Sequence, residues 1–231
     1  GGSALDKGGR GGNDAVKAGV LAELGAEDNT IVYNQINISL QYLRDSLLYE
    51  TINDFSIVNN KGIRYYTKNA HFPGINHLSL LSSTKKWRNQ ENLELLEQSL
   101  CHCMKIMMET EDYIMFKDNS HFVGPFNFDW KISHFDIANI KHDSYALVWW
   151  LRNLYKLSKL GVVFDVPELK AAYDYLYQLF ITQDIVHLQT DLSLKRFRDI
   201  LSIEDSWKNK NSMYCDIIFC CAIILHNAGY N

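Results

Sequence analysis

Proline is scarce in this sequence, with three residues among 231. Because proline removes a backbone hydrogen-bond donor and clashes with the preceding helical turn, long helices contain few prolines. The scarcity therefore favours an all-α fold. Hydrophobic residues make up 47% of the chain and charged residues 22%, which is the composition of a globular protein and not of a disordered one.

Long apolar runs are also missing. A membrane-spanning helix needs roughly 18 or more consecutive apolar residues, whereas the longest apolar run, 217–225, is about half that length and fits a buried core helix. The sequence does not open with a basic segment followed by an apolar one, as a secretory signal does. We expect a soluble, cytoplasmic protein without a membrane span.

The five cysteines lack the regular spacing of a disulfide framework, which favours reduced thiols. Cys101 and Cys103 flank His102, but side chains two residues apart on a helix point in nearly opposite directions, unlike a metal-binding pair. The last helix offers four more ligand-type residues: Cys215, Cys220, Cys221 and His226. We expect buried core cysteines instead. The sequence indicates neither a metal nor a nucleotide, and it identifies no cofactor.

No strong basic surface is evident, since the net charge is −4. The densest basic runs, 85–88 and 195–198, are short and have acidic residues nearby, as on a solvated helix face or loop. Proteins that bind nucleic acids draw most of their affinity from basic residues that neutralise phosphates. We therefore expect no nucleic-acid partner, and the sequence indicates no particular oligomeric state.

Helical spacing of apolar residues, bounded by capping residues and glycines, predicts about six main helices arranged as hairpins. Residues 1–12 form a flexible glycine-rich lead-in, and 13–231 a single helical domain. The intervening segments 53–90 and 112–141 are irregular, and 63–66 reads as a short strand without an evident partner. Long loops of this kind are often functional. The predicted helices are 13–24, 36–52, 90–110, 144–160, 167–179 and 212–227.

One helical hairpin resembles a known repeating unit. The segment HDSYALVWWLRNLYKLSKLGVVFDVPELKAAYDYLYQLF (142–180) has a first helix, Gly161, a short linker and a second helix that begins at Pro167-Glu168. It resembles the repeat of the α/α-toroid superfamily, which includes terpene cyclases, protein prenyltransferase β-subunits and toroidal glycan-processing enzymes. Residues 212–230 look like the first half of another repeat. The resemblance implies a toroid, or an incomplete one, around a central cavity; a generic helical-repeat array is the alternative.

The functional motifs of those families do not accompany the resemblance. The sequence has no acidic run of the class II cyclase type, no DDxxD motif and no zinc pattern of the prenyltransferases, and 204–207 only faintly echoes a Gln-Trp repeat. Because a shared fold does not determine function, the reaction has to be argued from other residues.

Polar residues gather just before the predicted 144–160 helix. Carboxylates and imidazoles are the groups needed for general acid–base catalysis, and in a toroid such a loop would line one mouth of the barrel. The alternative is that Asp143 is a helix N-cap flanked by His142, and that the other polar residues satisfy loop backbone groups. The candidate catalytic residues are Asp129, His134, Asp136, His142 and Asp143.

Aromatic residues are the candidates for substrate binding. Trp149 and Trp150 are adjacent on a predicted helix, so one can face the core while the other lines a cavity, and Trp130 lies in the polar segment. Aromatic walls suit sugar stacking and carbocation stabilisation, but they suit helix packing as well.

Two functions follow as hypotheses. The first is a toroid-type enzyme, or a fragment of one, that acts on a polyprenyl, glycan or peptide substrate in a central cavity. The second is a non-catalytic helical module for protein–protein interaction. The ligand would be a small molecule, a glycan or a peptide.

Overall fold

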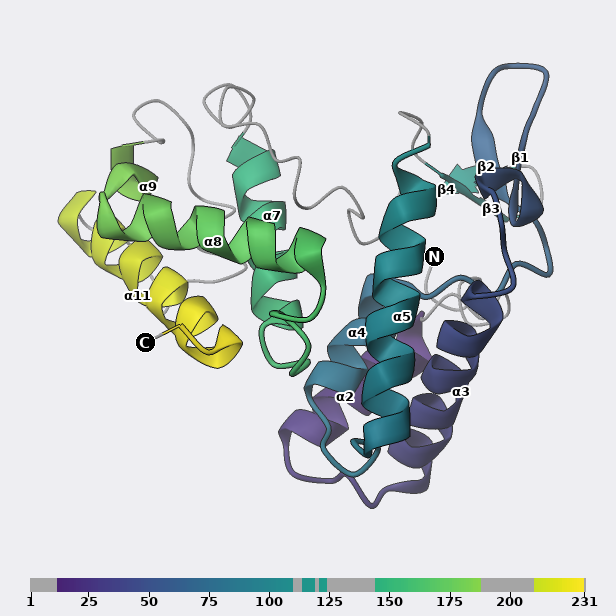
Figure 1. Cartoon of the computed structure of the whole chain (residues 1–231), viewed down its shortest axis with the longest axis horizontal. Helices are drawn as coiled ribbons and strands as arrows, with labels where there is room; N and C mark the ends of the chain where they lie inside the picture. The colour runs from purple at the N-terminus through teal and green to yellow at the C-terminus, as the bar shows by residue number, and fades with distance from the viewer. Residues whose placement is uncertain (1–11, 110–113, 119–120, 124–143, 188–209, 231) are drawn as a thin grey trace. The chain divides into compact units, whose positions relative to one another are not determined.

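The computed structural model describes residues 12–109, 114–118, 121–123, 144–187 and 210–230. Most of these residues are helical, and two small two-stranded sheets accompany the helices (Figure 1). The chain divides into two compact units, 1–130 and 131–231. A mostly helical fold is thus confirmed, while a single domain over 13–231 stays a prediction. None of the described helices is long and apolar enough to cross a bilayer.

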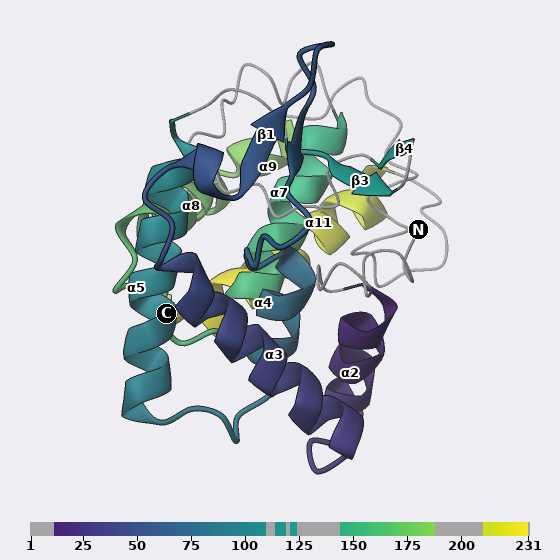
Figure 2. The same ribbon diagram turned by 90° about the vertical axis from the view of Figure 1, so that its right-hand side faces the viewer.

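The first unit is a helical bundle with short strands. Helix α3 (Thr30–Ser46) contacts α2 (Asn13–Glu23), α4 (Ile75–Ser82) and α5 (Gln90–Met107) (Figures 1 and 2). Leucines from three of the helices are fully buried between them: Leu43, Leu78, Leu81, Leu96 and Leu100. The elements are α2 (Asn13–Glu23), α3 (Thr30–Ser46), η1 (Ile52–Asp54), β1 (Ser56–Val58), β2 (Arg64–Tyr66), α4 (Ile75–Ser82), α5 (Gln90–Met107), β3 (Phe116–Asp118) and β4 (His121–Val123).

Helix α3 begins and ends six residues before the predicted helix 36–52, so those predicted bounds are wrong. The side chain of Asn29 accepts a hydrogen bond from the Ile31 N–H at 2.9 Å. This bond satisfies one of the free donors at a helix N-terminus and starts the helix there. The apolar stripe from Ile36 onward marks the buried part of α3, and the first turn is largely exposed.

Helix α4 lies inside the segment 53–90 that the sequence reading treats as irregular. It begins after Gly74, whose N–H donates to Nδ1 of His77 at 3.0 Å. Leu78, Leu80 and Leu81 are all fully buried. A helix buried around most of its circumference has no polar face, and so it lacks the amphipathic pattern that reveals other helices.

The predicted strand 63–66 is confirmed as β2, which pairs antiparallel with β1. Asn59 forms the turn between the strands, since its side chain accepts hydrogen bonds from the N–H groups of Lys61 and Ile63 at 2.9 Å each. Gly62 closes this turn with a φ of 76°, which favours glycine. A second hairpin, β3–β4, lies within the segment 112–141, where the sequence predicted no strands. Figure 2 shows both hairpins at the end of the bundle where α3 finishes.

The described residues of the second unit form four helices. They are α7 (Ser144–Leu157), α8 (Pro167–Ile181), α9 (Asp184–His187) and α11 (Lys210–Ala228). Helix α11 contacts each of the other three. The predicted hairpin is confirmed: Gly161 follows α7 with a φ of 86°, and Pro167 is the first residue of α8. The predicted helix 212–227 is confirmed as α11.

Tyr173 connects the two helices of this hairpin. Its ring is fully buried, and its hydroxyl donates to the Leu154 carbonyl at 2.6 Å. Burial raises the pKa of Tyr173 well above its ordinary value, so the phenol keeps its proton and remains a donor. The hydrogen bond therefore fixes α8 against α7.

We predict that Tyr173→Phe lowers the free energy of unfolding by about 1 kcal/mol, because the Leu154 carbonyl loses a buried hydrogen bond. Urea unfolding followed by circular dichroism measures the loss. Tyr177→Phe is the matched control, since it removes the same atom from a half-buried tyrosine of α8 whose hydroxyl has no hydrogen bond in the described structure. Equal unfolding midpoints for the two variants would contradict the role assigned to Tyr173.

Candidate functional site

The first turns of α3 and α5 line one groove, and an asparagine caps each helix. Asn29 caps α3 through the Ile31 N–H. Asn89 caps α5 by accepting a hydrogen bond from the Asn92 N–H at 2.8 Å. Because a cap fixes the residue at which a helix begins, these asparagines determine which side chains of the two first turns reach the groove.

The loop 83–89 between α4 and α5 supplies the floor of the groove through Trp87. The indole N–H of Trp87 donates to the carbonyls of Leu81 and Thr84 at 2.9 and 3.1 Å. Arg88 donates to the Thr84 carbonyl at 3.1 Å through Nε. These donors satisfy carbonyls at the C-terminal end of α4, which no helical partner can reach. Trp87 is consequently only 5% exposed.

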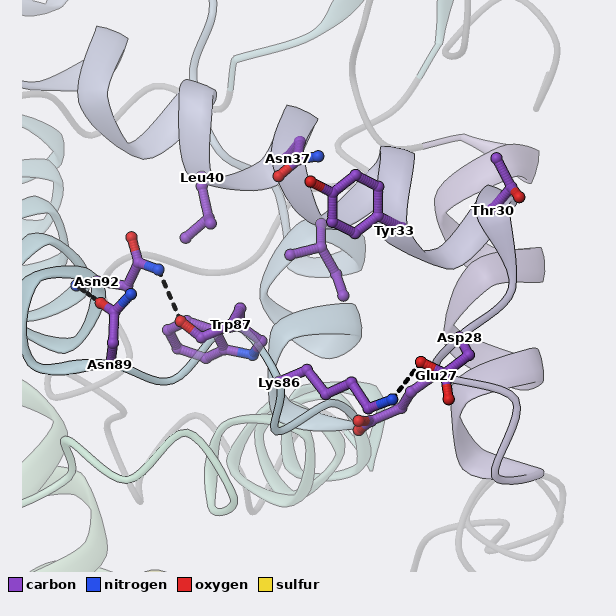
Figure 3. Close-up of a pocket in the computed structure, with 11 residues that line it drawn as sticks. Glu27, Asp28, Thr30, Tyr33, Asn37, Leu40, Lys86, Trp87, Asn89 and Asn92 are labelled. Atoms are coloured by element: carbon purple, nitrogen blue, oxygen red, sulfur yellow. Dashed lines mark hydrogen bonds and ion pairs between the residues drawn. The ribbon is translucent and has the colours of Figure 1, made fainter.

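The groove has a volume of about 410 Å³, within the range of about 300–1,000 Å³ that is usual for ligand pockets. Its floor is apolar, formed by the buried side chains of Ile36, Leu40 and Trp87. Figure 3 shows α3 along one side and the loop with the start of α5 along the other. Polar side chains form its rim: Glu27, Asp28, Thr30, Tyr33, Asn37, Lys86, Asn89 and Asn92.

The charged residues of the rim are already engaged. Lys86 forms an ion pair with Asp28. Glu27 accepts a hydrogen bond from the Lys85 N–H at 2.7 Å. Burial lowers the pKa of Arg88, and the carboxylate of Glu27 opposes that shift. The acidic and basic groups at the groove therefore partly offset one another, and one oxygen of each carboxylate is engaged.

The neutral residues of the rim offer free hydrogen-bonding groups. Thr30, Tyr33 and Asn37 line the groove from one face of α3, and their side chains make no hydrogen bond within the part of the chain that the structure describes. Tyr33 is 62% exposed. A primary amide donates and accepts at once, and hydroxyl groups do the same. The groove thus combines an apolar floor with neutral donors and acceptors.

Unlike the neutral residues on α3, Asn89 and Asn92 already use their side chains in hydrogen bonds that build the groove. The Asn92 side-chain amide donates to the Trp87 carbonyl at 2.6 Å, while the Asn89 side chain caps α5. Together they connect the loop that carries Trp87 to the first turn of α5. These two asparagines position the floor and leave the opposite side of the groove, on α3, to contact a ligand.

The candidate residues from the sequence lie elsewhere. Of Trp149 only the backbone is described, in α7. Trp150 is buried in the second unit, with its ring centroid 5.8 Å from that of Tyr175. Its role as a cavity wall stays a prediction. Six candidates lie outside the described residues: Asp129, Trp130, His134, Asp136, His142 and Asp143.

The cysteines are free thiols. Burial raises the pKa of Cys103 to about 12 and that of Cys220 to about 11, and it raises the pKa of Cys221 further. These thiols are protonated near neutral pH and are poor nucleophiles. The expectation of buried core cysteines is confirmed for these three, but Cys101 is half-buried and Cys215 is exposed. Among the described residues, no group of three or more His, Cys, Asp and Glu side chains is placed to hold a metal ion.

Sequence reasoning missed the groove. It assigned the basic run 85–88 to a solvated helix face or loop, which is correct for the exposed Lys85 and Lys86. The buried Trp87 within this run was the available signal, because a tryptophan between basic residues in a loop needs a partner for its N–H. The second run, 195–198, lies outside the described residues.

We predict that Asn89→Ala lowers the free energy of unfolding by about 1 kcal/mol, the usual cost of losing an N-cap. Asn89→Asp retains an acceptor and should preserve stability. Asn34→Ala is the control, since Asn34 lies exposed inside α3 and caps nothing. Urea titrations of the three variants test this, and a loss for Asn34→Ala as large as that for Asn89→Ala would show that Asn89 does not act as a cap.

Comparisons of the chain with known protein families, with curated proteins and with solved structures find no match.

Proposed function

We propose that this chain is a protein–protein interaction module whose groove between α3 and α5 is non-catalytic and binds an extended segment of a partner protein. The observation that supports the proposal is the row of unsatisfied neutral groups on α3 above an apolar floor. A peptide backbone presents alternating donors and acceptors, and an amide or hydroxyl can bond to either. An apolar side chain of the same peptide would contact Ile36, Leu40 and Trp87.

The length of the groove supports a short peptide. Thr30, Tyr33 and Asn37 follow one face of α3 at spacings of three and four residues. Seven residues of helix span roughly 10 Å at about 1.5 Å per residue. About three residues of extended chain cover that distance, at about 3.3 Å each. The face therefore suits a segment of about three residues between its outermost contacts.

The charges of the groove favour binding over catalysis. General acid–base catalysis needs a titratable group within reach of the substrate proton. Asp28 is paired with Lys86, and Glu27 accepts the Lys85 N–H. Because Lys86 offsets the charge of Asp28 and Arg88 interacts electrostatically with Glu27, the groove favours a segment that is neutral where it contacts α3.

A toroid-type enzyme, or a fragment of one, is the second proposal, acting on a polyprenyl, glycan or peptide substrate in a central cavity. The hairpin of α7 and α8, with Gly161 between the helices and Pro167 at the start of the second, supports it. Its candidate catalytic residues lie outside the described part of the chain, and the alternative role of Asp143 as an N-cap stays open.

A peptide selection tests the interaction module. We expect a phage-displayed library of random heptapeptides, selected on the folded chain, to yield peptides with one central apolar residue. Isothermal titration calorimetry should then show binding at least about 10-fold weaker to the double variant Tyr33→Ala/Asn37→Ala, because two hydrogen bonds of about 1 kcal/mol each are lost. Asn34→Ala, altered on the exposed part of the same helix, should bind like the wild type.

Two results would contradict the proposal. One is a selection that enriches no peptide over the library. The other is an enriched peptide that binds the double variant as tightly as it binds the wild type. Thermal melts of the double variant check that it remains folded, which is expected because Tyr33 and Asn37 are exposed.

A further inference from the structure

A histidine and an aspartate form a fixed pair at the far end of α3 from the groove. Nδ1 of His71 lies 2.6 Å from Oδ2 of Asp45. The imidazole stacks on the ring of Tyr42, with centroids 4.8 Å apart and planes 14° from parallel. The backbone N–H of His71 donates to the Tyr49 hydroxyl at 2.8 Å. Ring edge, ring face and backbone are thus each held by a different side chain.

The aspartate is oriented in turn. Oδ1 of Asp45 accepts a hydrogen bond from the Gln41 side-chain amide at 2.7 Å, which leaves Oδ2 directed at His71. A carboxylate can only accept, so in the neutral form of the imidazole Nδ1 carries the proton and Nε2 carries the lone pair. The side chain of His71 is 47% exposed, whereas that of Asp45 is 22% exposed. Asp45 therefore fixes the tautomer of His71. The nitrogen with the lone pair, Nε2, belongs to the more exposed of the two side chains.

Other described histidines differ from His71. His77 is buried, and its Nδ1 accepts the Gly74 N–H. Nε2 of His102 lies 2.7 Å from the Tyr49 carbonyl oxygen. Since a carbonyl only accepts, this Nε2 carries a proton and has no lone pair for attack. His226 is exposed, but it contacts no carboxylate among the described residues. Among these four, His71 alone combines exposure with an orienting carboxylate.

We propose that His71 is a nucleophilic imidazole that hydrolyses activated esters, with Asp45 as its orienting partner. Nε2 attacks the carbonyl carbon, and the bond to the leaving alkoxide or phenoxide breaks. The acylimidazolium that forms keeps its proton on Nδ1, which donates it in a hydrogen bond to the negatively charged Asp45. Water then attacks the acyl carbon, the bond to Nε2 breaks with its electron pair returning to Nε2, and a proton of the water passes to the released alkoxide or phenoxide. One ester and one water give one carboxylic acid and one alcohol.

The arrangement suits acyl transfer better than metal binding. A bound metal ion needs several ligands around it, and the described residues contain no such group around His71. Acyl transfer needs one nucleophile with a free lone pair and a partner that stabilises positive charge. His71 and Asp45 supply these, and the Tyr42 ring prevents the imidazole from rotating away. This inference does not depend on the groove, which lies at the opposite end of α3.

Turnover of 4-nitrophenyl acetate tests the proposal. We expect the full chain to release 4-nitrophenol over many turnovers, and His71→Gln to lose at least about 90% of the protein-dependent rate. Asp45→Asn should give an intermediate rate, because the imidazole remains but loses its orienting charge. His226→Gln should retain the wild-type rate. Thermal melts identify any variant that has lost its fold.

A second measurement keeps the test decisive if a substitution at His71 unfolds the protein. The wild-type chain is treated with diethyl pyrocarbonate for short times, and modified peptides are quantified by mass spectrometry. Carbethoxylation several-fold faster at His71 than at His226 supports a preoriented nucleophile. The proposal is overturned if His71 reacts no faster than His226, or if a folded His71→Gln variant hydrolyses the ester at the wild-type rate.

Discussion

The hydrogen bonds of the buried Trp87 indole determine how the first unit is organised around its groove. One N–H donates to two carbonyls that follow or end α4, those of Leu81 and Thr84, and the side chains of Thr84 and Arg88 donate to the same two carbonyls. The same residue presents its ring to the groove and its carbonyl to Asn92 at the start of α5. The end of one helix, the start of the next and the floor of the groove therefore meet at a single residue.

Helix α3 carries both proposed sites, at opposite ends. Its first two turns present Thr30, Tyr33 and Asn37 to the groove, where exposed neutral groups lie above buried apolar ones. Its last two turns present Tyr42 and Asp45 to His71. The middle of the helix is buried against α2, α4 and α5. A rigid central helix is a suitable support for sites that need fixed geometry.

The sequence predicted those elements that carry helical apolar spacing or a continuous apolar run. Helix α5 and the hairpin at Gly161 and Pro167 follow from apolar spacing and terminal residues, α11 contains the longest apolar run, and all are confirmed. The start of α3 was wrong because its first turn is largely exposed, with Val32 its one buried residue, and the cap at Asn29 marks where it begins. Helix α4 was missed because it is buried on most sides. Trp87 was the one sequence signal for the groove, whereas the pair of His71 and Asp45 could not be predicted because the two residues are 26 apart and meet only when their segments pack.

Hydrogen exchange of Trp87→Phe, measured by mass spectrometry, tests most directly the claim that Trp87 organises the groove. Phenylalanine keeps an aromatic ring on the floor but removes the N–H that binds the Leu81 and Thr84 carbonyls. The account predicts faster exchange in the loop 83–89 and in the first turns of α3 and α5, with unchanged exchange in α8 and α11. Exchange that is unaltered in the loop, or that rises equally in every helix, would contradict it.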